Sequence, residues 1–114
     1  MIFPLRVLGS PGLKSISFGA TTLIAKTDPV TFASDLIGWY AVQVNANDIA
    51  AAGGEPRWFL ATVLLPEGSA PAVVEGIFEQ LRAAAAGLQV ELVGGHTEVT
   101  IGLPRPIVVG MMLG

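Results

Sequence analysis

Three acidic residues are candidates for chemistry because each is expected near the end of a secondary-structure element. Asp28 follows an apolar stretch and precedes a proline, Asp48 lies near the end of a predicted helix, and Glu98 follows a pair of glycines. Carboxylates that are distant in sequence but gathered at element ends suit a hard divalent cation. Magnesium usually takes one or two carboxylates together with phosphate oxygens and water. The sequence therefore predicts that Asp28, Asp48 and Glu98 share one Mg²⁺ site.

The glycine pair before Glu98 adds a candidate phosphate contact. Because glycine has no Cβ, the backbone N–H groups of Gly94 and Gly95 can approach a phosphate closely, and the Thr97 hydroxyl adds a donor. His96, the single histidine, is a loop residue held by a hydrogen bond, a contact to phosphate or nucleotide or, as the last alternative, a metal ligand. The competing interpretation of the glycine pair is an ordinary turn after a strand.

The helix that carries Asp48 has an unusual face. Small and polar residues recur there at three- and four-residue steps, which places them in one stripe. Its members are Gly38, Ala41, Asn45, Asp48 and Ala52, and the apolar side holds Leu36, Ile37, Tyr40 and Val44. Small residues let a backbone or a ligand approach, so Asn45 and Asp48 are predicted to face it. The alternatives are a solvated Asp48 and a stripe that serves only for packing.

The remaining pattern predicts about four strands and two helices. Apolar and β-branched runs indicate strands, and helical spacing of apolar residues indicates helices. Residues 1–20 are rich in turn signals and are expected to be irregular, with a short strand allowed around residues 2–7. The strands are expected at residues 21–27, 57–65, 89–93 and 106–113, and the helices at residues 34–52, with Ser34 as N-cap, and 70–86. This β-α-β-α-β-β order predicts an α+β fold with both helices on one face of the sheet.

Two of the expected strands, residues 57–65 and 106–113, are apolar on both faces. Two helices can cover one face of such a sheet, and no further element remains for the second face. Another chain or a further domain must then cover it. Closed symmetric dimers are the commonest such solution, so we expect a homodimer.

Composition limits the class of protein. The chain has 114 residues, of which 52% are hydrophobic and 13% charged, which suits one domain with a modest core. No uncharged apolar run approaches the roughly 18–20 residues of a membrane span, and no signal peptide is evident. The net charge of −3, with scattered basic residues, argues against nucleic-acid binding. The absence of cysteine excludes disulfides and thiolate metal sites and permits the cytoplasmic location that we expect.

Four segments together resemble a known family. They are TDPVTF at 27–32, NANDIAAAGGEP at 45–56, GGHTE at 94–98 and RPIVVG at 105–110. In this order they resemble the N-terminal domain of the aminoimidazole ribonucleotide (AIR) synthase superfamily, the PurM-like enzymes. The residues of these motifs are most similar to the AIR synthase-related and hydrogenase-maturation branch, which includes a carbamoyl dehydratase. The resemblance covers residues 21–114.

The resemblance implies an enzyme that uses ATP and Mg²⁺ to transfer a phosphoryl group to an amide or acid oxygen. It also implies a homodimer in which two sheets form a barrel. By position, Asp28 and Asp48 match the magnesium-binding aspartates of the family, and Asn47 matches the asparagine of its Asn-Asp motif. Its phosphate-side loop is matched by Gly94, Gly95 and Thr97.

The chain departs from the family pattern in three places. The acidic, glycine-rich segment that precedes the first strand in the family is replaced by residues 12–18, which contain no acid. His96 stands where several relatives have aspartate, so one metal ligand would move to Glu98. The family's C-terminal domain is also expected to be absent. These departures favour a second hypothesis, a non-catalytic homodimerisation module that has lost the first phosphate-binding loop.

Overall fold

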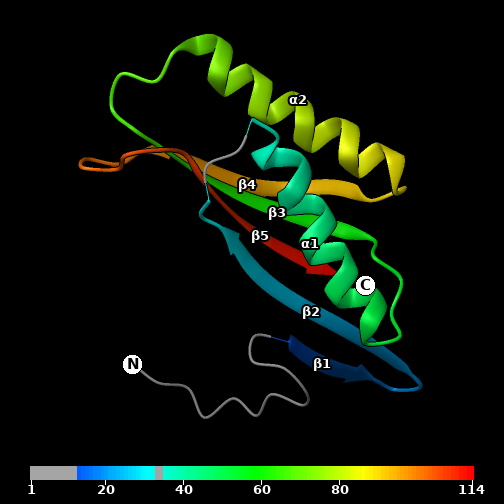
Figure 1. The fold of residues 1–114 in the computed structure, drawn as a ribbon. Coiled ribbons are helices and arrows are strands. Elements are labelled where there is room, and N and C mark those ends of the chain that lie inside the picture. Colours follow the sequence, from blue (N-terminus) through cyan, green and yellow to red (C-terminus); the bar gives the residue numbers. More distant parts are fainter. Residues whose placement is uncertain (1–12, 33–34) are drawn as a thin grey trace.

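The computed structural model describes residues 13–32 and 35–114. Within those residues the chain forms five strands and two helices, all joined in one α+β unit (Figure 1). The expectations for residues 1–12 and for Ser34 lie outside the described residues. The elements are β1 Leu13–Phe18, β2 Thr21–Val30, α1 Ile37–Ala51, β3 Trp58–Leu65, α2 Pro71–Gly87, β4 Glu91–Val99 and β5 Ile107–Leu113.

The five strands form one mixed sheet in the order β1-β2-β5-β3-β4. Only β3 and β4 run parallel, as expected for two strands joined through a helix, and the other neighbouring pairs are antiparallel. Both helices lie on the same side of the sheet, with α1 over β2 and β5 and α2 beside β4 (Figure 1). The predicted fold class and the placement of both helices on one face are confirmed.

The strand count is one higher than predicted. Residues 13–18, expected to be irregular, form β1 and pair antiparallel with β2 through a short turn at Gly19, whose φ is +61°. Glycine adopts this left-handed conformation without steric cost. Leu13 lies opposite Lys26 and Phe18 opposite Thr21, so the sheet gains a fifth strand. Residues 13–18 are thus an edge strand of the sheet.

Helix α1 begins at Ile37, three residues later than predicted. Its N-cap residue, Leu36, makes no side-chain cap hydrogen bond. Gln80 of α2 takes over this role: its Oε1 accepts from the Gly38 N–H at 2.9 Å, and its Nε2 donates to the Asp35 carbonyl at 2.6 Å. One N–H of the first turn of α1 is therefore satisfied from a helix distant in sequence, which local cap signals do not reveal.

The core lies between the sheet and the two helices. Alternate residues of β3 and β5 face the helices and are fully buried, among them Phe59, Val63, Val108 and Met112 at 0% exposure. The small-residue stripe of α1 forms part of this core, since Gly38, Ala41 and Asn45 are all buried. Gly38 lies so close to α2 that an added Cβ would stand 2.6 Å from the Ile77 carbonyl oxygen. Up to Asn45 the stripe is therefore a packing face.

The other side of the sheet, here called the open face, carries the remaining residues of the same strands. Ile16 is 40% exposed, Trp58 38% and Met111 42%, and neither helix of the described residues covers this face. The prediction that β3 and β5 are apolar on both faces is confirmed. Residues 13–32 and 35–114 of one chain do not bury this second face.

Neither helix of the described chain is long and apolar enough to cross a membrane.

Candidate functional site

The sequence predicted Asp28 at the end of a strand. In the structure β2 continues to Val30, so Asp28 lies within the strand. It pairs with Gly110 of β5, and the ladder continues to Val30 opposite Val108. Residues opposite each other in an antiparallel pair project to the same side of the sheet. A Cβ at Gly110 would point at Asn45 of α1, so Asp28 also belongs to the helix-covered face. Its position is partly buried, beside the middle of α1.

Asn45 connects α1 to this point of β2. Its side chain is 0% exposed, and its Nδ2 donates to the Ala41 carbonyl at 2.8 Å and more weakly to the Asp28 carbonyl at 3.4 Å. Its Oδ1 has no hydrogen-bond partner in the described residues. Reversing the amide would point Oδ1 at two carbonyl oxygens, so the assigned orientation is the favourable one. Asn45 thereby fixes the peptide of Asp28 against the helix that carries Asp48.

Asp48 lies one turn after Asn45, at the boundary between the packed stripe and solvent. Its side chain is 38% exposed, and its Oδ2 lies 3.8 Å from the Nζ of Lys26. The Lys26 side chain is 11% exposed. Asp48 is therefore a partly accessible carboxylate with a cation beside it, and not the solvated surface acid of the alternative interpretation.

Glu98 and His96 lie in a different part of the sheet. They belong to β4, where His96 is opposite Thr62 and Glu98 opposite Leu64, both on the open face. The His96 Nε2 and the Glu98 Oε1 are 3.1 Å apart, and the two side chains are 62% and 53% exposed. The Thr100 hydroxyl also donates weakly to Glu98, at 3.4 Å.

The single site of three carboxylates is consequently not formed within one chain. Asp28 is on β2 and the helix-covered face, whereas Glu98 is on β4 and the open face. Strands β5 and β3 stand between them, so three strand spacings of about 4.8 Å put β4 roughly 14 Å from β2. Within residues 13–32 and 35–114 no group of three or more His, Asp or Glu side chains is placed to hold a metal ion. Asp28 and Asp48 remain on one face, on neighbouring elements.

The glycine pair was expected in a turn or loop, but it lies within strand β4. β4 continues through it to Val99, and the register skips Val93, which makes a β-bulge just before Gly94. Gly95 has a φ of +156°, and a Cβ there would lie 2.0 Å from the Ala61 carbonyl oxygen. Bulges with glycine often stand next to functional sites because they redirect the strand. Here the bulge brings the β4 backbone tightly against β3.

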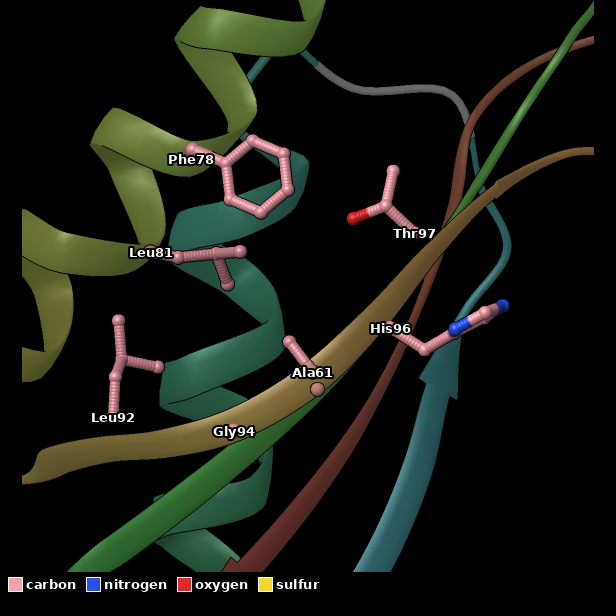
Figure 2. A pocket seen from close by; sticks show the side chains of 8 residues that line it. Ala61, Phe78, Leu81, Leu92, Gly94, His96 and Thr97 are labelled. Atoms are coloured by element: carbon pink, nitrogen blue, oxygen red, sulfur yellow. The ribbon is translucent and has the colours of Figure 1, made fainter.

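Beyond the bulge, the outer edge of β4 pairs with no other strand of the described residues. The Thr100 N–H donates to the Leu65 carbonyl of β3 at 2.8 Å. Successive residues of a strand direct their N–H groups alternately to one side and the other, so every second residue before Thr100 also faces β3. The N–H of Thr97 accordingly points away from β3. Its side chain projects toward α2, while the His96 ring lies on the other side of the strand (Figure 2). Thr97 thus offers a backbone donor and a hydroxyl at the same edge.

A cavity of about 350 Å³ lies between β4 and α2 next to these donors (Figure 2). Its walls are mostly apolar, from Phe78 and Leu81 of α2 and Leu92 of β4. A second hollow of about 350 Å³ lies on the open face and includes His96. β4 therefore contributes to a hollow on each side of the sheet.

The last predicted contact, Asn47, is exposed on α1 and lies off the packed stripe. Lys26 did not figure among the predicted site residues. Its position two residues before Asp28 places it on the same face of a strand, and a lysine in an otherwise apolar run is the signal that could have identified it. The bond from Asn45 to Asp28 depends on the packing of α1 on β2 and has no local signal.

Comparison with known proteins places this arrangement in context. The family model "AIR synthase related protein, N-terminal domain" matches residues 14–114. Thiamine-monophosphate kinase of Aquifex aeolicus (strain VF5) is 33% identical over 66 residues, which are 58% of this chain and 22% of the kinase. Carbamoyl dehydratase HypE of Rhodobacter capsulatus is 32% identical over 92 residues, 81% of this chain and 26% of the relative.

A solved structure has the same fold. Hydrogenase maturation protein HypE in complex with ATP superposes with a TM-score of 0.78 at 23% identity, over 87% of this chain and 31% of that one. This chain spans only 22% and 26% of the lengths of the two curated relatives. The chain is thus similar to only one part of each of these longer proteins.

Proposed function

Since the chain belongs to the AIR synthase related family, through that family's N-terminal domain, we propose that it is the nucleotide- and magnesium-binding domain of an ATP-dependent enzyme. The reaction we propose is phosphoryl transfer to an amide or acid oxygen. The related HypE structure with ATP supports nucleotide binding. The observation in this chain that carries the proposal is the placement of Asp28 and Asp48 on one face, with Asn45 of α1 bonded to the Asp28 carbonyl and Asp48 beside Lys26 of β2.

Asp28 and Asp48 are the residues that we propose to hold Mg²⁺. The donor set fits this ion, because two partly accessible carboxylates on neighbouring elements leave the other coordination positions to water and phosphate oxygens. A bound magnesium would neutralise charge that develops on the transferred phosphoryl group. Asn45 would keep Asp28 in place relative to α1, since its amide is bonded to both.

The nucleotide contacts are proposed for the edge of β4. Thr97 would donate to a phosphate from its N–H and its hydroxyl, and the backbone of Gly94 and Gly95 lines the same cavity. Asn47 is exposed on α1 and is proposed as a further polar contact. His96 and Glu98 lie on the open face, so their part in a nucleotide or metal site depends on a second copy of the chain.

We propose that the open face forms a homodimer interface. Exposed apolar side chains such as Trp58 and Met111 would be covered there by their counterparts in the partner. A stable interface buries roughly 800 Å² per subunit. We place the dimer in the cytoplasm, which the cysteine-free sequence permits.

A second candidate is a dimerisation module without catalytic activity. Two observations favour it: residues 13–18 form a strand where the family has an acidic loop, and Asp48 is already paired with Lys26. On either hypothesis the isolated chain should bind magnesium–ATP weakly, with a Kd on the order of 1 mM, or about −4 kcal/mol. Micromolar binding in calorimetry would contradict this expectation.

Thermal unfolding with and without Mg²⁺ tests the metal site. A ligand that binds only the folded state stabilises it by mass action, by about 1.4 kcal/mol at tenfold excess over Kd. We expect this stabilisation in the natural chain and its loss in Asp48→Asn. Asp35→Asn removes the same charge from an exposed position just before α1 and should retain the stabilisation. Equal magnesium effects in both variants would refute the assignment of Asp48.

A further inference from the structure

Lys26 is placed unusually for a lysine. It lies on β2 opposite Met112 of β5, and Met112 is completely buried under the helices. Opposite residues project to the same side, so the Lys26 side chain enters the layer between sheet and helices. Only 11% of it is exposed, which is rare for a residue type that is almost never buried unless paired.

The ammonium of Lys26 meets the carboxylate of Asp48 at 3.8 Å. Removing a charge from water is costly unless an opposite charge compensates, so the pairing with Asp48 favours this position of Lys26. Asp48 is more accessible, at 38%, and its carboxylate can still be reached from solvent. The pair therefore has a nearly buried positive end and a half-exposed negative end.

We propose that Lys26 is an internal competitor for a divalent cation at Asp48. This inference rests on the proposed function, in which the same carboxylate binds Mg²⁺. A Mg²⁺ ion on Asp48 would stand within a few ångströms of the ammonium, and like charges at that distance repel, the more strongly where water is scarce. In the absence of metal, Lys26 satisfies the carboxylate. When metal binds, the ammonium must either move away or stay and repel the ion. Either way, the affinity of the site for Mg²⁺ is lowered.

The consequence is a metal affinity set by a residue that does not touch the metal. Removing the charge of Lys26 should tighten Mg²⁺ binding by at least tenfold, because the carboxylate loses its resident cation while its own charge and position remain. A purely structural ion pair would behave differently. Its loss would lower the stability of the fold and leave the magnesium affinity unchanged.

The test is calorimetric titration of the full chain with MgCl₂ alone, at constant ionic strength. Lys26→Gln removes the charge, and Lys26→Arg keeps it. Arg82→Gln is the matched control, since it removes one positive charge from an ion pair with Glu79 on the exposed surface of α2. We expect tighter binding only in Lys26→Gln, natural affinity in the other two, and loss of the gain in the double variant Lys26→Gln, Asp48→Asn.

The possible results separate this inference from the proposed function. Unchanged or weaker magnesium binding in Lys26→Gln, with binding by the natural chain intact, would overturn the inference alone. A gain of equal size in Arg82→Gln would also overturn it, because the effect would then reflect net charge. Absence of magnesium binding in every variant would overturn both the metal site and the inference. If Lys26→Gln does not fold, Lys26→Met keeps the apolar stem of the side chain and is judged by the same results.

Discussion

The two faces of the sheet are built from the same strands but differ in how far their side chains are buried. On β3, Phe59 and Val63 face the helices and are completely buried, whereas their neighbour Trp58 on the open face is 38% exposed. On β5, Met112 is completely buried and Met111 is 42% exposed. Both faces are apolar, so composition does not separate them. What separates them is that α1 and α2 both pack on one side.

This difference also divides the candidate site. Asp28, Lys26 and Asp48 gather on the covered face, where Asn45 bonds to the Asp28 carbonyl and Lys26 pairs with Asp48. His96 and Glu98 lie on the open face, at the far edge of the sheet. One chain therefore assembles the half of the site that its own helices organise. We infer that the other half needs a second copy.

The largest effect should come from the covered face. Truncation of a fully buried aromatic residue costs about 3–5 kcal/mol, so Phe59→Ala should lower the free energy of unfolding by that amount. Met111→Ala on the open face should instead shift the dimer dissociation constant. Chemical denaturation at several protein concentrations distinguishes the two. A loss from Phe59→Ala below about 1 kcal/mol would contradict the covered face as the core.

A smaller effect is expected where β5 contacts α1. A Cβ at Gly110 would lie 2.4 Å from Asn45 Nδ2 and 2.7 Å from the Phe59 ring, so Gly110→Ala should cost about 1–3 kcal/mol through overpacking. Gly76 is the control, because it lies in α2 with nothing within 4 Å of an added Cβ. Gly76→Ala should stabilise by about 0.5–1 kcal/mol, since alanine favours a helix interior. Denaturation curves in which both variants lose equal stability would contradict this account of Gly110.

The smallest effect is expected on the open face of β4. An added Cβ at Gly94 would meet only the Leu60 side chain, at 3.6 Å, which is ordinary contact. Gly94→Ala should change the stability of the single chain by no more than about 0.5 kcal/mol. Gly95→Ala should be far worse, because its Cβ would stand 2.0 Å from the Ala61 carbonyl oxygen. Thermal unfolding of the two variants measures this contrast, and a severe loss in Gly94→Ala would contradict it.

Periodicity in the sequence predicted the helices and strands whose positions are set by the spacing of apolar residues. The helices and three of the strands lie within a few residues of their expected positions, because apolar spacing and flanking glycine and proline mark them. β1 was missed because its six residues follow a turn-rich segment and become a strand by pairing with β2. The length of β4 was missed because glycines usually end a strand, whereas here a bulge accommodates them.

The site was predicted less completely than the fold. The motifs indicated Asp28 and Asp48 as candidates, and the structure places both on one face. They did not indicate the face to which Glu98 projects, because this depends on a one-residue bulge at Val93 that reverses the alternation along β4. The Lys26–Asp48 pair depends on how α1 lies over β2, which no local pattern specifies.

Sedimentation equilibrium at micromolar concentration tests most directly the claim that the open face is an interface. We predict a mass of two chains for the natural protein and of one chain for Met111→Asp, since an unpaired charge buried in the interface costs several kcal/mol. Val73→Asp is the control, because Val73 is 48% exposed on α2, away from the open face, and this variant should remain dimeric. A mass of one chain for the natural protein would contradict the account.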